Sequence, residues 1–187
     1  TMTAHDGCVS NKDIWHNRLT GAEVKTVEQL GVTLETTHDR LGRKTLEMLA
    51  PKTSGQAQRS HRYLLADKLG DAVQTQTVAA NGAMTMTKLD GMGRKALVEV
   101  QDMDAAAQPM RSVYAAQYDA LGQLAEETNA DWLDGKLHGL TTRYTYDDWG
   151  NREASIGPDG VKTLEQNDPV TLTQTHGMES AGKTVIR

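Results

Sequence analysis

Residues 118–122 read Tyr118-Asp119-Ala120-Leu121-Gly122, and the last four of them are one of five copies of a short motif. In each copy an Asp is followed three residues later by a Gly, with an apolar residue just before the Gly. Successive Asp residues are 28, 23, 29 and 28 positions apart. Repetition at such an interval is typical of architectures in which each unit packs against its neighbours. The other copies are Asp39-Arg40-Leu41-Gly42, Asp67-Lys68-Leu69-Gly70, Asp90-Gly91-Met92-Gly93 and Asp147-Asp148-Trp149-Gly150.

The residue types of the motif are those of a tight turn. An Asp at the first position accepts hydrogen bonds from the turn's own amides, and a Gly at the fourth adopts the left-handed conformation that closes a bulged hairpin. We expect the apolar residue before the Gly to pack back onto the sheet. The predicted turn residues are Asp39, Gly42, Asp67, Gly70, Asp90, Gly93, Asp119, Gly122, Asp147 and Gly150.

Short runs between the copies alternate polar and apolar residues, which is the pattern of half-buried strands. Asn81-Gly82, Asp134-Gly135 and Asp159-Gly160 predict type I′ hairpin turns. The sequence therefore predicts an all-β chain, an open strip of antiparallel β-hairpins. The alternating runs are 32–38, 72–78, 96–100, 140–146 and 170–175.

Residues 1–30 lack clear alternation, and Ser10 with Asp13 is suited to capping a short helix that ends at Arg18. We therefore expect an irregular lead-in over residues 1–30 and the repeat strip over residues 31–187. Thr184-Val185-Ile186-Arg187 ends the sequence within a strand-like run, so we expect a fragment of a longer chain.

Composition restricts the function further. The 187 residues carry 20 Lys and Arg against 25 Asp and Glu, a net charge of −5, which argues against a nucleic-acid partner. One cysteine, Cys8, cannot form an intramolecular disulfide and supplies too few thiolates for a zinc or iron–sulfur site. No signal-peptide pattern and no stretch of eighteen apolar residues is present, so we expect no direct membrane insertion.

Three segments resemble the YD repeats of RHS proteins. They are Tyr118-Asp119-Ala120-Leu121-Gly122-Gln123-Leu124, Tyr144-Thr145-Tyr146-Asp147-Asp148-Trp149-Gly150-Asn151-Arg152 and the variant Leu89-Asp90-Gly91-Met92-Gly93-Arg94-Lys95. The resemblance covers residues 33–187. The repeats are most similar to those of the shell built by the B and C components of bacterial insecticidal Tc toxin complexes. Type VI secretion effectors and teneurins share the repeat.

This resemblance implies a long curved antiparallel sheet of β-hairpins that forms part of a hollow shell around a toxic polypeptide. It implies a secreted, non-enzymatic structural segment without cofactors. Its partners would be the remainder of the RHS shell, the enclosed toxin polypeptide and the other toxin-complex components. Two features depart from the family: His38, Ala66 and Leu89 replace the Tyr in three copies, and the closing segment that carries the family's aspartyl protease activity has no counterpart. The alternative is a carbohydrate- or protein-binding YD-repeat module.

Gly177-Met178-Glu179-Ser180-Ala181-Gly182-Lys183-Thr184 matches the P-loop pattern of nucleotide-binding enzymes. A P-loop needs a helix that begins at its lysine, because the helix N-terminus binds the phosphate. Val185 and Ile186 favour a strand instead, so a hairpin loop is the better interpretation.

Other candidate sites have structural explanations. His5-Asp6-Gly7-Cys8 contains metal-ligating residue types, but no second cluster completes four ligands, and a surface turn is expected. The five motif carboxylates suggest a glycosidase pair, yet turn capping explains all of them. Tyr144, Tyr146 and Trp149 could stack on a sugar, although packing within the protein is the simpler role for Tyr144 and Tyr146, which lie on one strand face.

Overall fold

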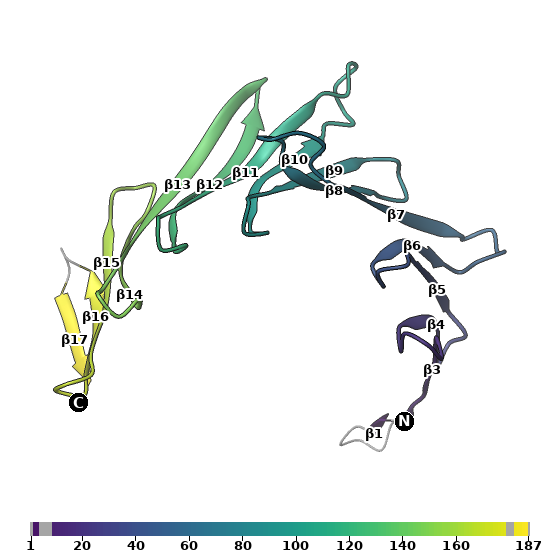
Figure 1. Ribbon diagram of the computed structural model, residues 1–187, viewed down its shortest axis with the longest axis horizontal. Helices are drawn as coiled ribbons and strands as arrows, with labels where there is room; N and C mark the ends of the chain where they lie inside the picture. The colour runs from purple at the N-terminus through teal and green to yellow at the C-terminus, as the bar shows by residue number, and fades with distance from the viewer. Residues whose placement is uncertain (1, 4–8, 179–181, 187) are drawn as a thin grey trace. The chain divides into compact units, whose positions relative to one another are not determined.

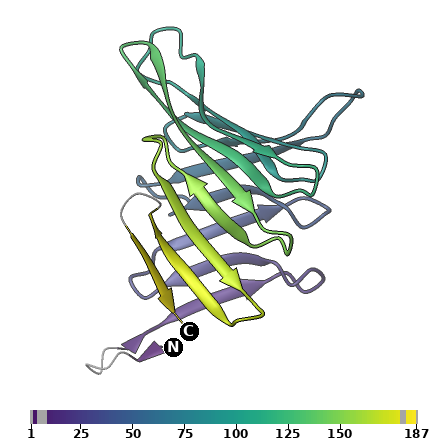
Figure 2. The ribbon, with the colours of Figure 1, turned by 90° about the vertical axis from the view of Figure 1, so that its left-hand side faces the viewer.

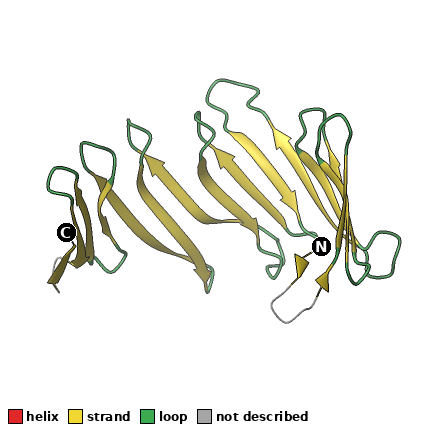
Figure 3. Ribbon diagram, turned by 90° about the horizontal axis from the view of Figure 1, so that it is seen from below, coloured by secondary structure: helices red, strands yellow, loops and turns green. Residues whose placement is uncertain are grey.

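The computed structural model describes residues 2–3, 9–178 and 182–186, and its regular structure in those ranges is entirely β-strand. Figure 3 shows strands joined by loops, with no helix in the described part of the chain. The prediction of an all-β chain of hairpins is confirmed. No helix of the length and apolarity required to cross a bilayer occurs among these residues.

Strands β3 to β17 are ordered in the sheet as they are in the sequence, which the gradual change of colour in Figure 1 follows. The chain divides into two compact units, Thr1–Met86 and Thr87–Arg187, with the division inside strand β9 (Met84–Leu89). Each unit is a series of antiparallel neighbours joined by short turns, as expected for hairpins.

The first unit begins with a separate pair of two-residue strands, β1 (Met2–Thr3) and β2 (Val9–Ser10). The sheet strands of this unit that precede β9 are β3 (Lys12–His16), β4 (Glu23–Glu28), β5 (Thr33–His38), β6 (Lys44–Leu49), β7 (Ala57–Leu64) and β8 (Val73–Val78).

The second unit contains longer strands, and Figure 2 shows its last five lying side by side with alternating direction. Its strands after β9 are β10 (Lys95–Gln101), β11 (Met110–Tyr118), β12 (Leu124–Leu133), β13 (Lys136–Tyr146), β14 (Arg152–Ile156), β15 (Lys162–Asp168), β16 (Thr173–Met178) and β17 (Gly182–Ile186).

The lead-in expected over residues 1–30 is wrong from residue 12 onward, because β3 and β4 belong to the sheet. They form an antiparallel hairpin, and the helix expected up to Arg18 is absent. The reason is local. The side chain of Asn17 accepts hydrogen bonds from the amides of Leu19 and Thr20, and Gly21 has φ +69°. This turn brings β4 back antiparallel to residues 12–16, which pair with it as a strand and not as a helix.

The turn types differ in part from those predicted. Asp134 and Gly135 both have positive φ, 50° and 73°, and join Leu133 to Lys136 as the predicted type I′ turn. At Asn81-Gly82 and Asp159-Gly160 only the glycine has positive φ. The Asn81 and Asp159 side chains accept the amide two residues ahead, which holds a longer bulged turn like those of the Asp motifs. The run predicted over 170–175 begins only at residue 173, because Asp168 caps a turn there.

Each unit is a layer of strands with almost no core. Ala154 and Leu164, which are register partners, are 2% and 5% exposed, and Thr26 is 6% exposed. Every other residue whose exposure is described is more accessible. Stability must therefore come mainly from the strand ladders and from side-chain contacts along the sheet.

The apolar residues of the motifs do not pack onto the sheet, which corrects that expectation. Their exposures lie between 77% and 107%, because the third residue of each turn points away from the strand ends. These exposed turn tips are Leu41, Leu69, Met92, Leu121 and Trp149.

Candidate functional site

Four of the five predicted turn aspartates cap their turns in the same way. Oδ1 of Asp119 accepts the amides of Leu121 and Gln123 at 2.9 and 2.8 Å. The amide of Asp119 donates to the Gln123 carbonyl, and the amide of Gly122, at φ +85°, donates to the Asp119 carbonyl. This is a bulged hairpin turn in which the left-handed residue must be a glycine or strained. Asp39, Asp90 and Asp147 repeat these contacts, with Gly42, Gly93 and Gly150 left-handed.

The copy at Asp67 is different. Its loop spans residues 65–72, longer than the other four, and the carboxylate of Asp71 instead accepts the amide of Lys68 at 3.1 Å. Gly70 still has positive φ, +96°. The motif therefore marks the position of a turn here, while the capping role has moved to a second aspartate.

The residue after the motif glycine adds an ion pair in two copies. Nε and Nη2 of Arg94 each lie 2.7 Å from Oδ2 of Asp90, and Arg43 pairs with Asp39 in the same way. These contacts lower the pKa of both carboxyls, although desolvation opposes them. For Asp90 the largest cause is the hydrogen bond from the Arg94 side chain, and for Asp39 it is the Arg43 amide.

A tyrosine of the following hairpin completes each of these turns. The Arg94 guanidinium lies 4.0 Å from the centroid of the Tyr118 ring, and the Tyr118 hydroxyl donates to the carbonyl of Lys95 at 3.0 Å. In the first unit, Tyr63 makes the corresponding contacts with Arg43 and with the Lys44 carbonyl. Such cation–π and hydrogen-bond contacts tie one hairpin to the next.

Hydrogen bonds also join successive turns of the second unit, and at the Asp119 turn the residue after the glycine is Gln123 instead of an arginine. Nη1 of Arg94 donates to the carbonyl of Gly122 at 2.6 Å, and Nε2 of Gln123 donates to the carbonyl of Gly150 at 3.4 Å. The Tyr146 hydroxyl donates to the carbonyl of Leu124 at 2.9 Å. These bonds join hairpins about one repeat apart, and we call them the turn-to-turn bonds.

Glu127 binds two tyrosines on one face of the second unit. Its Oε1 accepts the Tyr144 hydroxyl at 2.5 Å and its Oε2 accepts the Tyr114 hydroxyl at 3.2 Å. The hydrogen bond to Glu127, with desolvation and the carboxylate charge, raises the pKa of Tyr144 to about 12. Arg152 lies 5.7 Å from the Tyr144 ring centroid. Tyr144 is thus engaged within the protein, the role that the sequence favoured, whereas Trp149 is at an exposed turn tip, so the alternative of a three-residue stacking platform is not assembled.

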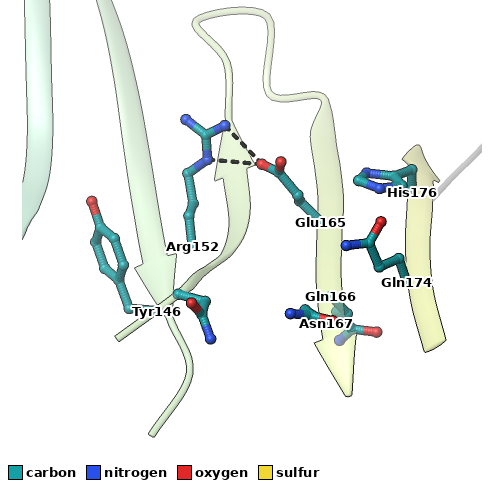
Figure 4. A pocket seen from close by; sticks show the side chains of 8 residues that line it. Tyr146, Arg152, Glu165, Gln166, Asn167, Gln174 and His176 are labelled. Atoms are coloured by element: carbon teal, nitrogen blue, oxygen red, sulfur yellow. Dashed lines mark hydrogen bonds and ion pairs between the residues drawn. The ribbon is translucent and has the colours of Figure 1, made fainter. Parts of the chain in front are cut away.

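A polar pocket lies beside Tyr146 on strands β13 to β16, and Figure 4 shows its side chains. Nη2 and Nε of Arg152 contact Oε2 of Glu165 at 2.7 and 3.1 Å. The register places His176 opposite Glu165 and Gln174 opposite Asn167. The pocket is lined by Tyr146, Asn151, Arg152, Glu165, Gln166, Asn167, Gln174 and His176.

The remaining sequence candidates form no site in the described part of the chain. Gly182 to Ile186 is strand β17, in which Lys183 is the register partner of Gly177, so a strand stands where a P-loop needs a helix. Residues 179–181 and the cluster at His5 and Cys8 lie outside the described ranges. No group of three potential metal ligands occurs among the residues described.

Sequence reasoning missed the partners of the turn aspartates. Tyr63 lies four residues before Asp67, and the position directly before that Asp, where the repeat has its Tyr, is Ala66. Arg43 and Arg94 each follow a motif glycine directly, and that shared position was the available signal. The pocket residues come from four strands without a common spacing, and only the strand register brings them together.

No family model and no curated protein matches the sequence. Among solved structures, the chain is similar to crystal structures of TcdB2-TccC3, one with Cdc42 and one without the hypervariable C-terminal region. Each has 12% sequence identity and a TM-score of 0.48 over 95% of this chain. A further TcdB2-TccC3 structure has 11% identity and a TM-score of 0.33. The chain spans about a tenth of the length of the first two structures, 11%.

Proposed function

We propose that this chain is a structural segment of an RHS-repeat shell that sequesters a toxic polypeptide before delivery. The observation that carries the proposal is the series of turn-to-turn bonds. Arg94 reaches the Gly122 carbonyl and Gln123 reaches the Gly150 carbonyl, so each hairpin is fixed to the next and not to a core. A sheet built in this way can be extended by adding hairpins.

The polar composition of the strand faces is compatible with a wall that encloses a polypeptide. Nearly all strand residues are half-buried or exposed, and polar side chains are frequent among them: Thr alternates with Met along β9, and Gln and Thr fill the middle of β8. The most exposed large apolar side chains, such as Leu41 and Leu121, lie in turns and not on the strand faces that would line the enclosed polypeptide. In this proposal the segment is secreted, acts without catalysis or a cofactor, and contacts the rest of the shell, the enclosed toxin and the other toxin-complex components.

The test is protection of the enclosed polypeptide in the complete shell protein. Trypsin is expected to spare the toxin polypeptide in the wild-type shell. It should digest that polypeptide in a Gly122→Val, Gly150→Val variant, because valine is strained at φ +85° and +84°. Gly91→Val is the matched control, since Gly91 lacks positive φ and its Cβ would meet open space. Equal digestion in the wild type and the double variant would contradict the proposal.

A further inference from the structure

We propose that the polar pocket on strands β13 to β16 binds a neutral saccharide unit. This ligand site goes beyond the role of the sheet as a wall. The pocket has a volume of about 410 Å³, within the range of small-molecule sites. Figure 4 shows that Arg152, Glu165, Gln174 and His176 come from three neighbouring strands.

The pocket has one ion pair and no excess charge of either sign, so a neutral ligand suits it better than a strongly charged one. Arg152 and Glu165 neutralise one another through two contacts to Glu165 Oε2. The pairing lowers the pKa of Glu165, mainly through the hydrogen bond from Arg152, so the pair stays ionised at neutral pH. With one carboxylate, already paired, the lining lacks the several oxygen ligands that Ca²⁺ requires. A neutral ligand with many hydrogen-bonding groups fits this lining.

Unused hydrogen-bonding groups supply the recognition. The amides of Asn167 and Gln174 are on adjacent strands as register partners, and His176 is opposite Glu165. Each amide offers two donors and an acceptor. Within the part of the chain that the structure describes, none of these three side chains has a hydrogen bond to the protein. Neighbouring hydroxyls of a pyranose ring each donate and accept, so they match planar amides held side by side.

Tyr146 supplies the apolar contact that a sugar ring needs. Its hydroxyl is bound to the Leu124 carbonyl, which fixes the position of the ring at the pocket wall. The C–H face of a pyranose packs on such a ring. Tyr144 cannot serve, because Glu127 holds its hydroxyl and Arg152 lies near its ring.

Saturation-transfer NMR on the complete shell protein tests the site, using the methyl glycosides of glucose, galactose, mannose and N-acetylglucosamine as probes. We expect at least one glycoside to receive saturation. Asn167→Leu and Gln174→Leu should each weaken its binding by about five- to tenfold, as expected for a lost hydrogen bond. Tyr146→Phe should retain binding, and Tyr146→Leu should abolish it. Gln117→Leu, an exposed strand glutamine outside the pocket, is the control and should change nothing.

Three results would overturn the proposal. The first is no saturation transfer to any of the four glycosides. The second is transfer that persists unchanged in Asn167→Leu and Gln174→Leu. The third is stronger transfer to an N-acetyl amino-acid methylamide, which would make the pocket a polypeptide site. Circular dichroism of each variant verifies that the sheet is intact, so lost binding is assigned to the pocket. A failed result here would leave the trypsin-protection test of the wall unaffected.

Discussion

Gly93 and Gly122 occupy the same position in two turns, but their surroundings differ. Both have positive φ, 78° and 85°. A Cβ at Gly93 would meet nothing within 4 Å, whereas a Cβ at Gly122 would lie 2.7 Å from Nη1 of Arg94. At Gly122 the missing side chain therefore serves both the backbone conformation and the approach of the arginine.

We expect Gly93→Ala to lower the free energy of unfolding by about 1 kcal/mol through left-handed strain alone. Gly122→Ala should cost about 1 kcal/mol more, because Arg94 must leave the Gly122 carbonyl. Urea denaturation measures both losses. In an Arg94→Ala background the two substitutions should become equally costly. Equal losses in the wild-type background would show that the Arg94 contact adds nothing to stability.

At the residue scale, the sequence predicts the contacts within a turn but not those between turns. Asp and Gly act through their own backbone neighbours, so a motif of four letters predicts their contacts at Asp39, Asp90, Asp119 and Asp147. The Asp67 copy differs because its loop is longer and Asp71, just outside the motif, accepts the amide of Lys68. The tyrosine partners could not be derived from the motif, because they come from the next hairpin.

At the scale of strands and hairpins, the tyrosine hydroxyls join consecutive elements. Tyr118→Phe and Tyr146→Phe each remove one hydrogen bond to a backbone carbonyl and keep the ring. We expect each to lower the free energy of unfolding by about 1 kcal/mol. Hydrogen exchange should accelerate at the amides of the hairpins that the bond joins. Tyr114→Phe is a useful comparison, because its hydroxyl contacts a side chain, Glu127, and not a backbone carbonyl. Unchanged exchange in Tyr118→Phe would contradict the linking role.

The Glu127 cluster gives a prediction for alkaline pH. The pKa of Tyr144 is about 12 in the fold against 10.0 for an ordinary tyrosine. Because the folded pKa is raised, the cluster contributes its full stability below pH 10 and loses it as the pH rises toward 12. Desolvation, and then Glu127, also raise the pKa of Tyr114. Ultraviolet titration of tyrosinate should show a tyrosine that ionises near pH 12 and is missing in Tyr144→Phe.

Glu127→Gln provides the control for that titration. It keeps a hydrogen-bond acceptor near both hydroxyls but removes the negative charge, so the pKa of Tyr144 should fall toward 10. A tyrosine titration curve identical to that of the wild type would mean that Glu127 does not hold Tyr144 in the neutral form.

The strands were the most predictable elements, and the failures have a physical cause. Alternation along residues 72–78 and 96–100 predicts β8 and β10 within one or two residues. Residues 10–30 were misassigned because Asn17 acts as a turn cap, while the prediction assumed an Asp motif or a helix cap. Side-chain pairs across strands, such as Asn167 with Gln174, depend on a register that alternation alone does not give.

At the scale of the whole molecule, many large apolar side chains are exposed in both units. Strands β3 and β17 stand at the two ends of the strand order, each with one neighbour, and the turn tips Leu41 and Leu121 are exposed. Open edges and exposed tips favour association with other chains. We therefore expect the isolated chain to self-associate, as measured by sedimentation velocity.

Substitutions at the exposed turn tips test whether these residues cause self-association without contributing to the stability of the fold. Leu41→Ser and Leu121→Ser should reduce self-association without lowering the denaturation midpoint, because both side chains already lie in solvent. Leu164→Ser should instead destabilise the fold, since Leu164 is one of the few buried residues. A monodisperse monomer with slowly exchanging strands would identify an autonomous domain and contradict this prediction.

The turn-to-turn bonds also determine how the sheet should respond to a mechanical load. Because each bond joins one hairpin to the next, a pulling force applied to the chain ends acts first on a terminal hairpin and reaches the others in sequence. Copies such as Asp90, Asp119 and Asp147 are 28 or 29 residues apart, so each detached hairpin would release about 95 Å of chain. The sheet should therefore unfold stepwise, one hairpin at a time, with extensions of about that length.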